Sequence, residues 1–178
     1  MKLEDGTGTG LVAAVDSNNH LEVSSTTSSE SHFIALKKAQ TYIWTSSYST
    51  STGDEIIYIK NTSKDKVLVI DKVTVNSVLT GLFELCVVTG TPSGTSITGA
   101  NTNLTSGNVA AATALGDAAV TGVTSALRID MARVPAAGRA TMELNDVLIL
   151  GFNDAITITY TGSTGITDTI ITGYYLDN

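Results

Sequence analysis

Apolar and polar side chains alternate with a period of two over most of the chain beyond residue 40. In Ala155–Thr161, three large apolar residues (Ile156, Ile158 and Tyr160) fall on one face and three threonines fall on the other. Such alternation is typical of a half-buried antiparallel strand. The same rule predicts strands at Glu55–Lys60, Lys66–Asn76, Gly81–Val88, Ala126–Met131, Thr141–Leu144, Asp146–Leu150 and Thr169–Leu176.

One of these strands, Lys66–Asn76, is apolar on both faces at its start. Its alternating positions are Val67, Val69, Val73 and Val75 on one face, and Leu68, Ile70 and Thr74 on the other. A strand that is apolar on both sides is buried between two layers. The pattern therefore predicts that a second layer covers this strand.

The polar segments between the strands indicate how the strands connect. Asn61–Asp65 and Gly151–Asp154 are short and turn-rich, and we expect each to close a hairpin. Gly90–Val123 is rich in Ala, Gly, Thr and Asn, and Gly116 and Gly122 argue against a long helix, so we expect a long crossover loop. Seven or eight short strands with one long connection predict an all-β fold, an antiparallel jelly-roll-like β-sandwich.

The first forty residues differ from the rest of the chain. Leu11–Val15 and Leu21–Val23 flank Asp16–Asn19, whose asparagines suit a tight turn, so we expect a small hairpin. Ser24–Ser31 contains no apolar residue and is typical of a linker. We therefore divide the chain into an N-terminal attachment arm (residues 1–40) and a jelly-roll β-sandwich (residues 41–178).

The hairpin of the arm needs a second surface, because an isolated hairpin is marginally stable in water. Two interpretations remain open: the hairpin packs on its own sandwich, or it docks on a partner. In the second case the docking residues are the apolar side chains of the arm, Leu11, Val12, Val15, Leu21 and Val23.

The composition narrows the range of partners. Of the 178 residues, 42% are hydrophobic and only 15% are charged, against about 25% charged in an average soluble domain. The net charge is −7, and the ten Lys and Arg residues form no dense cluster, so we expect no binding to nucleic acid or to an anionic membrane. No apolar run approaches the roughly 18 residues of a membrane span, and the first residues lack a secretory apolar segment. We expect a soluble product made in a cytoplasm.

No motif predicts catalysis, a cofactor or a metal site. Gly8–Ala13 fits the dinucleotide glycine pattern but has no strand before it and no helix after it. Asp16–His20 looks like the opening of a calcium loop but lacks the required glycine and the distal glutamate. The two histidines, His20 and His32, lie in the arm, and the chain has neither a nucleophile elbow nor enough His and Cys for zinc. We expect a protein that is not an enzyme and that uses no cofactor.

Two groups of reactive or aromatic side chains allow more than one interpretation. Cys86 is the single cysteine and lies in the apolar strand Gly81–Val88, so we expect a buried and unreactive thiol. Trp44 with Tyr42 and Tyr48 is either a platform that stacks sugars or part of a strand that contributes aromatic side chains to a core or a subunit interface. We favour the second interpretation.

Several segments resemble a known family. Lys2–Gly10, followed by Ala14–Val23, resembles the N-terminal arm of virion structural proteins of tailed bacteriophages. The segments that resemble the jelly-roll domains of such proteins are Ile57–Ser63, Leu68–Ile70, Asn101–Leu104 with Ser106–Asn108, and Asn153–Ile158. The resemblance covers most of the chain loosely, and its motifs are turns and strands, so it carries over no catalytic residue.

The resemblance implies a non-enzymatic capsid decoration, cement or head-fibre protein, made in the host cytoplasm and located in the virion, with the capsid surface favoured. Its partners would be the major capsid protein or other virion proteins, and further copies of itself in a homo-oligomer, with a trimer favoured. A tail or fibre module that binds a receptor or a carbohydrate is the alternative, and exposed aromatics around Trp44 and Tyr174–Tyr175 would favour it. A depolymerase-type enzyme is a third possibility.

Overall fold

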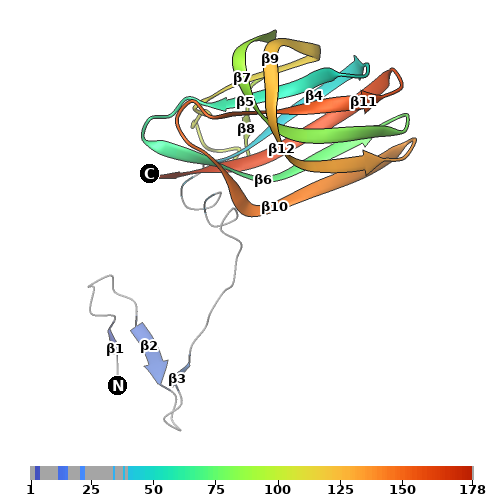
Figure 1. The fold of residues 1–178 in the computed structure, drawn as a ribbon. Helices are drawn as coiled ribbons and strands as arrows, with labels where there is room; N and C mark the ends of the chain where they lie inside the picture. The colour runs from blue at the N-terminus through green and yellow to red at the C-terminus, as the bar shows by residue number, and fades with distance from the viewer. Residues whose placement is uncertain are drawn as a thin grey trace.

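The structure is a computed structural model that describes residues 3–4, 12–15, 21–22, 34, 38 and 40–177 (Figure 1). From residue 40 onward the chain is built from strands, so the all-β prediction is confirmed. These strands are β4 (Thr41–Thr50), β5 (Asp54–Asn61), β6 (Lys66–Ser77), β7 (Gly81–Ser96), β8 (Ala100–Asn101), β9 (Ala112–Val134), β10 (Gly138–Leu150), β11 (Ala155–Gly162) and β12 (Gly165–Asp177).

Two antiparallel sheets pack against each other in the body of the molecule (Figure 1). The first sheet has the order β10-β6-β12-β4-β8, and the second has the order β5-β11-β7-β9. Along the chain, β4, β6, β10 and β12 belong to the first sheet, and β5, β7, β9 and β11 belong to the second. When the two-residue strand β8 at the edge of the first sheet is set aside, successive strands cross from sheet to sheet, except that β7 and β9 are neighbours in the second sheet. This is the connectivity of a jelly roll, as predicted.

The core lies between the two sheets and is formed by their inward faces. In β11, Ile156, Ile158 and Tyr160 are fully buried, as their alternation predicted. In β4, Tyr42 and Trp44 are buried in the same core, so this strand supplies aromatic side chains to the core. Burying a large apolar side chain stabilises the folded state by about 1.5–3 kcal/mol.

A bulge in β6 changes which side chains face the core. The core residues of this strand are Leu68, Ile70, Val73 and Val75, whereas Val69 is buried in a separate cluster on the other face. The register between β6 and β12 shifts at Asp71, so the alternation skips one residue there. The prediction that both faces are covered is confirmed. The assignment of Val69 to the face of Val73 and Val75 was wrong, because a bulge interrupts the period of two.

The segments Asn61–Asp65 and Gly151–Asp154 do not close hairpins, so both hairpin predictions were wrong. β5 pairs with β11 and β9, whereas β6 pairs with β10 and β12, and the first segment therefore crosses between the sheets. The second segment crosses in the same way from β10 to β11. Alternation identifies strands but does not identify their partners, which explains the error.

Asn61 holds these two crossing segments together. Its side-chain amide donates to the carbonyl oxygens of Lys66 and Leu150, both at 2.9 Å, and its side-chain oxygen accepts from the backbone N–H of Ser63 at 2.9 Å. Its backbone carbonyl accepts from the N–H of Asn153, also at 2.9 Å. Asn61 is 0% exposed. A glycan cannot be attached to it in the folded protein, although it begins an Asn-x-Ser sequence.

Gly90–Val123, predicted as a long crossover loop, instead contains the extended ends of β7 and β9 together with β8. Gly90 and Gly122 have positive φ values of 114° and 77°, a conformation that few other residues adopt. A Cβ on Gly90 would lie 2.4 Å from the carbonyl oxygen of Gly122, so the two backbones approach closely. The loop prediction was wrong because the Gly- and Thr-rich composition hid a paired ribbon.

The bend in this ribbon brings the start of β9 alongside β5 and closes the second sheet on itself (Figure 1). A second small cluster fills the closed space, with Tyr58, Val88, Val120 and Ala155 buried. Thr157, from the threonine face of β11, is also fully buried there and donates to the carbonyl of Ile57 at 2.7 Å. The ribbon therefore covers a face that alternation alone assigns to solvent.

The predicted strands Thr141–Leu144 and Asp146–Leu150 are one strand, β10, interrupted by a bulge. Its pairing with β6 shifts register between Glu143 and Leu148. Asn145 and Asp146 have positive φ values of 47° and 63°, a conformation that Asn and Asp tolerate better than most residues. The bulge lets the strand continue along the edge of the first sheet.

The arm contains a small sheet of its own. β1 (Leu3–Glu4), β2 (Val12–Val15) and β3 (Leu21–Glu22) pair antiparallel in the order β1-β2-β3. Within it, Ala14 pairs with Glu22 and Val15 pairs with Leu21. The hairpin predicted around Asp16–Asn19 is thus confirmed, and β1 adds a strand that the sequence pattern did not predict.

Candidate functional site

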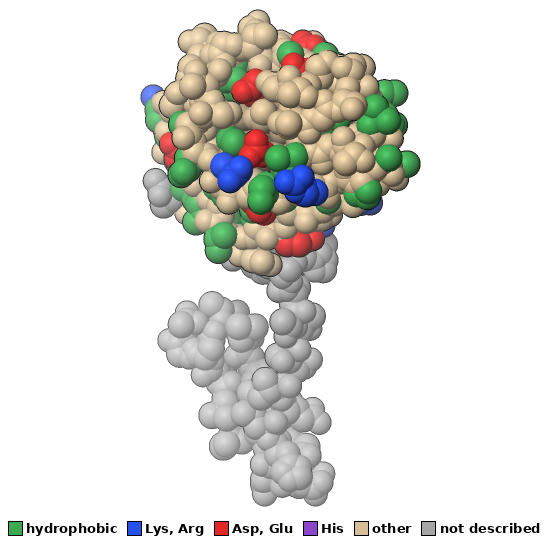
Figure 2. Space-filling view, turned by 45° about the vertical axis from the view of Figure 1, so that its right-hand side comes forward, with side chains coloured by type: hydrophobic (Ala, Val, Ile, Leu, Met, Phe, Trp, Pro, Cys, Tyr) green, Lys and Arg blue, Asp and Glu red, His purple; other side chains and the backbone are tan. Residues whose placement is uncertain are grey.

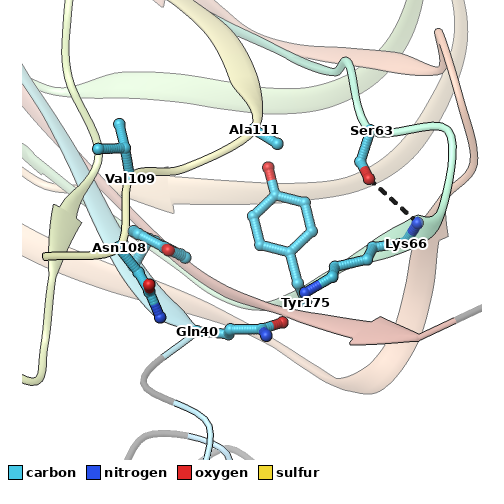
Figure 3. Close-up of a pocket in the computed structure, with 8 residues that line it drawn as sticks. Gln40, Ser63, Lys66, Asn108, Val109, Ala111 and Tyr175 are labelled. Atoms are coloured by element: carbon cyan, nitrogen blue, oxygen red, sulfur yellow. Dashed lines mark hydrogen bonds between the residues drawn. The ribbon is translucent and has the colours of Figure 1, made fainter. Parts of the chain in front are cut away.

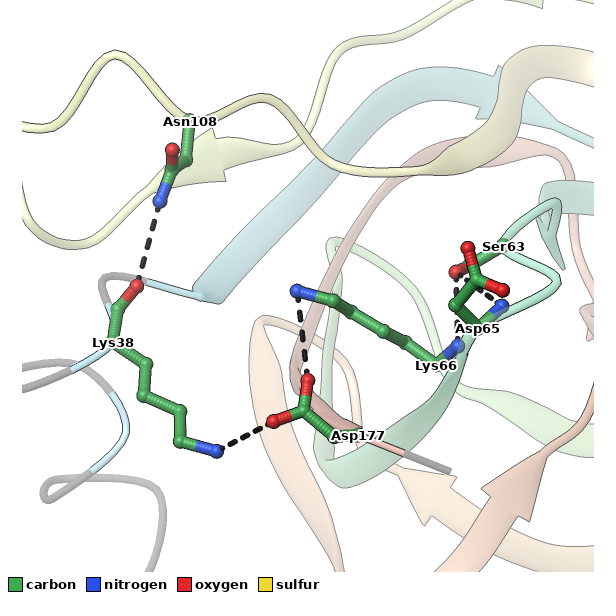
Figure 4. A network of polar contacts seen from close by, with 6 residues as sticks. All are labelled: Lys38, Ser63, Asp65, Lys66, Asn108 and Asp177. Atoms are coloured by element: carbon green, nitrogen blue, oxygen red, sulfur yellow. Dashed lines mark hydrogen bonds and ion pairs between the residues drawn. The ribbon is translucent and has the colours of Figure 1, made fainter.

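Polar contacts gather at the end of the sandwich where the chain enters β4 and where β12 ends, which we call the arm end. Lys38 and Gln40 precede β4, Asp177 ends β12, Ser63 lies in the connection from β5 to β6, and Lys66 begins β6. Figure 4 shows how these segments, distant in sequence, meet at one place. The arm end is therefore the junction between the arm and the sandwich.

Ile34 fixes the last part of the arm on the sandwich. It is 2% exposed and packs in a cluster with Val69 of β6 and Tyr174 of β12. The backbone N–H of Lys38 donates to the carbonyl of Ile34 at 3.0 Å, which is one helical turn. Ile34 therefore covers the outer face of the first sheet and accounts for the second apolar face at the start of β6.

Two lysines share one carboxylate at the arm end (Figure 4). Lys38 Nζ lies 3.0 Å from one oxygen of Asp177, and Lys66 Nζ lies 3.8 Å from the other. The hydrogen bond from Lys38 lowers the pKa of Asp177. The backbone N–H of Tyr175 also donates to the carbonyl of Gln40 at 3.1 Å. These contacts tie residues 38–40 to β12.

A pocket with a volume of about 220 Å³ opens beside this junction (Figure 3). Its wall includes Gln40, Tyr175, Lys66 and Val109. The hydroxyl of Tyr175 and the side-chain oxygen Oε1 of Gln40 are buried, and neither has a hydrogen-bond partner in the described part of the chain. Figure 3 shows the Tyr175 ring standing in the pocket with its hydroxyl directed towards Ala111. Burial raises the pKa of Tyr175, so this hydroxyl keeps its proton at neutral pH.

The predicted docking residues lie only partly in the described structure. Val12 and Val15 belong to β2, and Leu21 belongs to β3, so the structure brings these three into one small sheet. Leu11 and Val23 lie outside the described residues, as do both histidines and the Asp16–His20 segment. Ala13, the last residue of the Gly8–Ala13 pattern, is in a strand, whereas a dinucleotide site places a helix there.

Most of the aromatic side chains considered as a sugar platform are not available on the surface. Tyr42, Trp44, Tyr174 and Tyr175 are buried, and Tyr48 is half-buried. Tyr42 packs edge-on against Tyr175, with 5.7 Å between the ring centroids. The exposed aromatics that would favour the carbohydrate-binding alternative are therefore absent at these positions.

Cys86 lies on the outer face of β7 and is 6% exposed, as predicted. Burial raises the pKa of its thiol. Arg128 pairs with it across the strands but forms an ion pair with Glu84 instead. An unactivated thiol in this setting is a poor nucleophile.

Metal sites and membrane spans were sought among the described residues. No three His, Cys, Asp or Glu side chains in this part of the chain are arranged to hold a metal ion. It also contains no helix of the length and hydropathy needed to cross a bilayer. Figure 2 shows Lys and Arg beside Asp and Glu rather than in a basic patch on the face that it displays.

Sequence reasoning missed the residues that define the arm end. Ile34 follows the Ser/Thr-rich linker in a short apolar run, Phe33–Leu36, which is a weak signal for an anchor. Gln40 gave no signal, and Tyr175 was considered only as an exposed aromatic. Their importance depends on buried polar atoms that lack partners in the described part of the chain. Comparison of the chain with models of protein families, with curated proteins and with solved structures gave no match.

Proposed function

We propose that the protein is a non-enzymatic structural component of a phage particle that decorates or cements the capsid surface. The observation that carries this proposal is that the chain forms two structural parts, a small N-terminal sheet and a jelly roll. The jelly roll is preceded along the chain by the small sheet, β1–β3, and Ile34, which lies between them in sequence, packs on the jelly roll. The resemblance of the arm to those of virion proteins supports the same function.

In this proposal the arm attaches the protein to the particle. A three-stranded sheet with strands of two to four residues is too small to be stable alone in water. It gains stability by adding backbone hydrogen bonds and apolar contacts to another protein. Because many copies cover one particle, weak attachments act together. The major capsid protein, or another virion protein, is the partner that this geometry suits.

Self-association has its own support in the exposed side chains. Beyond Gly116, β9 pairs with β7 and no longer with β5, β10 is an edge strand of the first sheet, and β9 and β10 contact each other. The exposed apolar residues of these two strands are Leu127, Ile129, Met131, Val147 and Ile149. Apolar residues grouped on unpaired edges are typical of interfaces. We propose that copies of the sandwich meet along this side in a homo-oligomer, with a trimer favoured.

Mass spectrometry of purified particles, with heads and tails separated, tests this proposal. We expect the protein in the head fraction, at a constant ratio to the major capsid protein in particles washed at high salt. Its presence only in tails would instead support a tail or fibre module. Its absence from washed particles would overturn the structural role.

The second candidate function is that of a module that binds a carbohydrate or a receptor. Trp44 does not support it, because Trp44 is buried. The pocket at the arm end is the observation that favours it, because two buried polar atoms there have no hydrogen-bond partner within the described ranges of the chain.

A further inference from the structure

The pocket at the arm end has features of a ligand site rather than of a packing defect. Buried side-chain polar atoms almost always have a hydrogen-bond partner, and an unpartnered one lowers stability. Tyr175 is 2% exposed, and its hydroxyl has no such partner among the residues that the structure describes. Tyr160, by contrast, is also buried but donates to the carbonyl of Ser163 at 2.8 Å. A phenylalanine at position 175 would fill the same space without an unpartnered hydroxyl.

The two unpartnered atoms define what a ligand must offer. Gln40 Oε1 only accepts a hydrogen bond, whereas the neutral hydroxyl of Tyr175 both donates and accepts. A carboxylate only accepts, so it leaves Gln40 unpartnered. An ammonium group only donates hydrogen bonds, and its positive charge would lie beside that of Lys66, which lines the same pocket. An uncharged hydroxyl both donates and accepts, so several hydroxyls on one ligand can satisfy both atoms.

The charges, walls and size of the pocket agree with this chemistry. Lys66 is already within 3.8 Å of Asp177, which also pairs with Lys38, so the cation of the wall has a counter-charge. Val109, 74% exposed, lines the pocket together with Ala111 and offers an apolar surface to C–H groups. The volume of about 220 Å³ is many times the roughly 10–15 Å³ of cavity volume that a single water molecule needs.

We propose that this pocket binds an uncharged polyhydroxyl ligand the size of one hexose ring, such as a terminal sugar of a glycan. Its hydroxyls donate to Gln40 Oε1 and exchange a hydrogen bond with Tyr175, and its C–H face lies on Val109. The site does not depend on attachment to a particle, so its failure and the failure of the proposed structural function are distinguishable.

The test is a titration of the full-length, isotope-labelled protein with glucose, galactose and mannose, followed by NMR at the Gln40 side-chain amide and at the Val109 and Ala111 backbone. At least one hexose should cause saturable shifts at millimolar concentration. Acetate and acetamide are the matched probes for a carboxylate and an amide, and neither should saturate the site.

Two buried tyrosines provide matched variants. Tyr175→Phe should raise the melting temperature of the free protein and weaken hexose binding at least about tenfold. Tyr160→Phe should lower the melting temperature and leave binding unchanged. Gln40→Met, which keeps the length of the side chain, should also weaken binding while the protein stays folded. The proposal is overturned if no hexose shifts the pocket signals, if binding survives both pocket variants, or if only acetate or acetamide binds. An ordered water alone at Tyr175, with no saturable sugar effect, overturns it as well.

Discussion

The side-chain amide of Asn61 donates a hydrogen bond to the carbonyl oxygen of Leu150, 2.9 Å away and 89 residues further along the chain. The same side chain also bonds to Lys66 and Ser63 in its own connection. One buried amide therefore joins the crossing from β5 to β6 with the crossing from β10 to β11. These crossings border the arm end, so Asn61 also supports the candidate site.

Asn61→Ala should lower the free energy of unfolding by about 2–4 kcal/mol, because it leaves buried backbone groups without partners. Urea unfolding of the two proteins measures the difference. Asn103 is the matched control: it also begins an Asn-x-Thr sequence, and its side-chain oxygen accepts from Thr105 within the same loop. Asn103→Ala should cost less than about 1 kcal/mol. Equal effects of the two substitutions would contradict the role assigned to Asn61.

Because β7 and β9 form a bent ribbon, alanine substitutions at two glycines should affect stability very differently. Gly122 has a φ of 77°, and a Cβ there would lie 2.2 Å from the carbonyl oxygen of Thr91. Gly122→Ala should therefore destabilise the protein by roughly 2 kcal/mol or more. Gly107 has nothing within 4 Å of its Cβ position, so Gly107→Ala should change stability little. If thermal unfolding shows Gly122→Ala to be neutral, residues 90–123 do not form this ribbon.

The strands could be predicted from the sequence because a half-buried sheet imposes its period of two on the side chains, as in Ile156, Ile158 and Tyr160. The partners of the strands and the positions of the bulges could not be predicted from the sequence. At Asp71 an extra residue reverses the alternation, and in Gly90–Val123 the ribbon is held by backbone pairing that uses small and polar side chains. Neither feature depends on hydrophobic periodicity, so the pattern does not reveal it.

Asp71, at the bulge of β6, should give the stability of the protein an unusual pH dependence. Burial, followed by the nearby charge of Asp146, raises the pKa of Asp71 above its ordinary value of 3.8. The folded protein then binds this proton more tightly than the unfolded chain does, so the contribution of Asp71 to stability falls as the pH rises from 3.8 through the raised pKa. Asp71→Asn should be more stable than the parent at neutral pH, and this gain should shrink in acid.

Unfolding measured at several pH values tests this, with Asp177→Asn as a control of opposite sign. Lys38 lowers the pKa of Asp177, so the stabilisation from Asp177 is present above pH 3.8 and is lost as the pH falls through its lowered pKa. Asp177→Asn should therefore be slightly less stable than the parent at neutral pH. A loss of stability in Asp71→Asn at neutral pH would contradict the account of the bulge.

Cys86 should be chemically silent in the native protein. Its side chain is buried, its pKa is raised by burial, and Arg128 is engaged by Glu84. A thiol reagent should label the native protein slowly and the denatured protein at once. Fast labelling of the native protein at neutral pH would show that the thiol is exposed or activated.

The candidate site was less predictable than the fold. The apolar residues of the arm gave a signal because they stand out in a polar segment, and β2 and β3 bear out the hairpin. Ile34 gave little signal, since a short apolar run after a linker does not show what it packs against. The pocket gave none, because Gln40 and Tyr175 become unusual only in the folded chain, where their buried oxygens have no partner among the described residues.

Rebinding of truncated protein to particles that lack it tests the attachment role of the arm most directly. Deletion of residues 1–30 keeps Ile34, Lys38 and Gln40, whose contacts belong to the sandwich, so the melting temperature should stay close to that of the parent. Binding to the particles should be lost, and the full-length variant Val12→Asp with Val15→Asp should bind more weakly than the parent. Normal binding by a folded, truncated protein would contradict the account and would place the attachment surface on the sandwich.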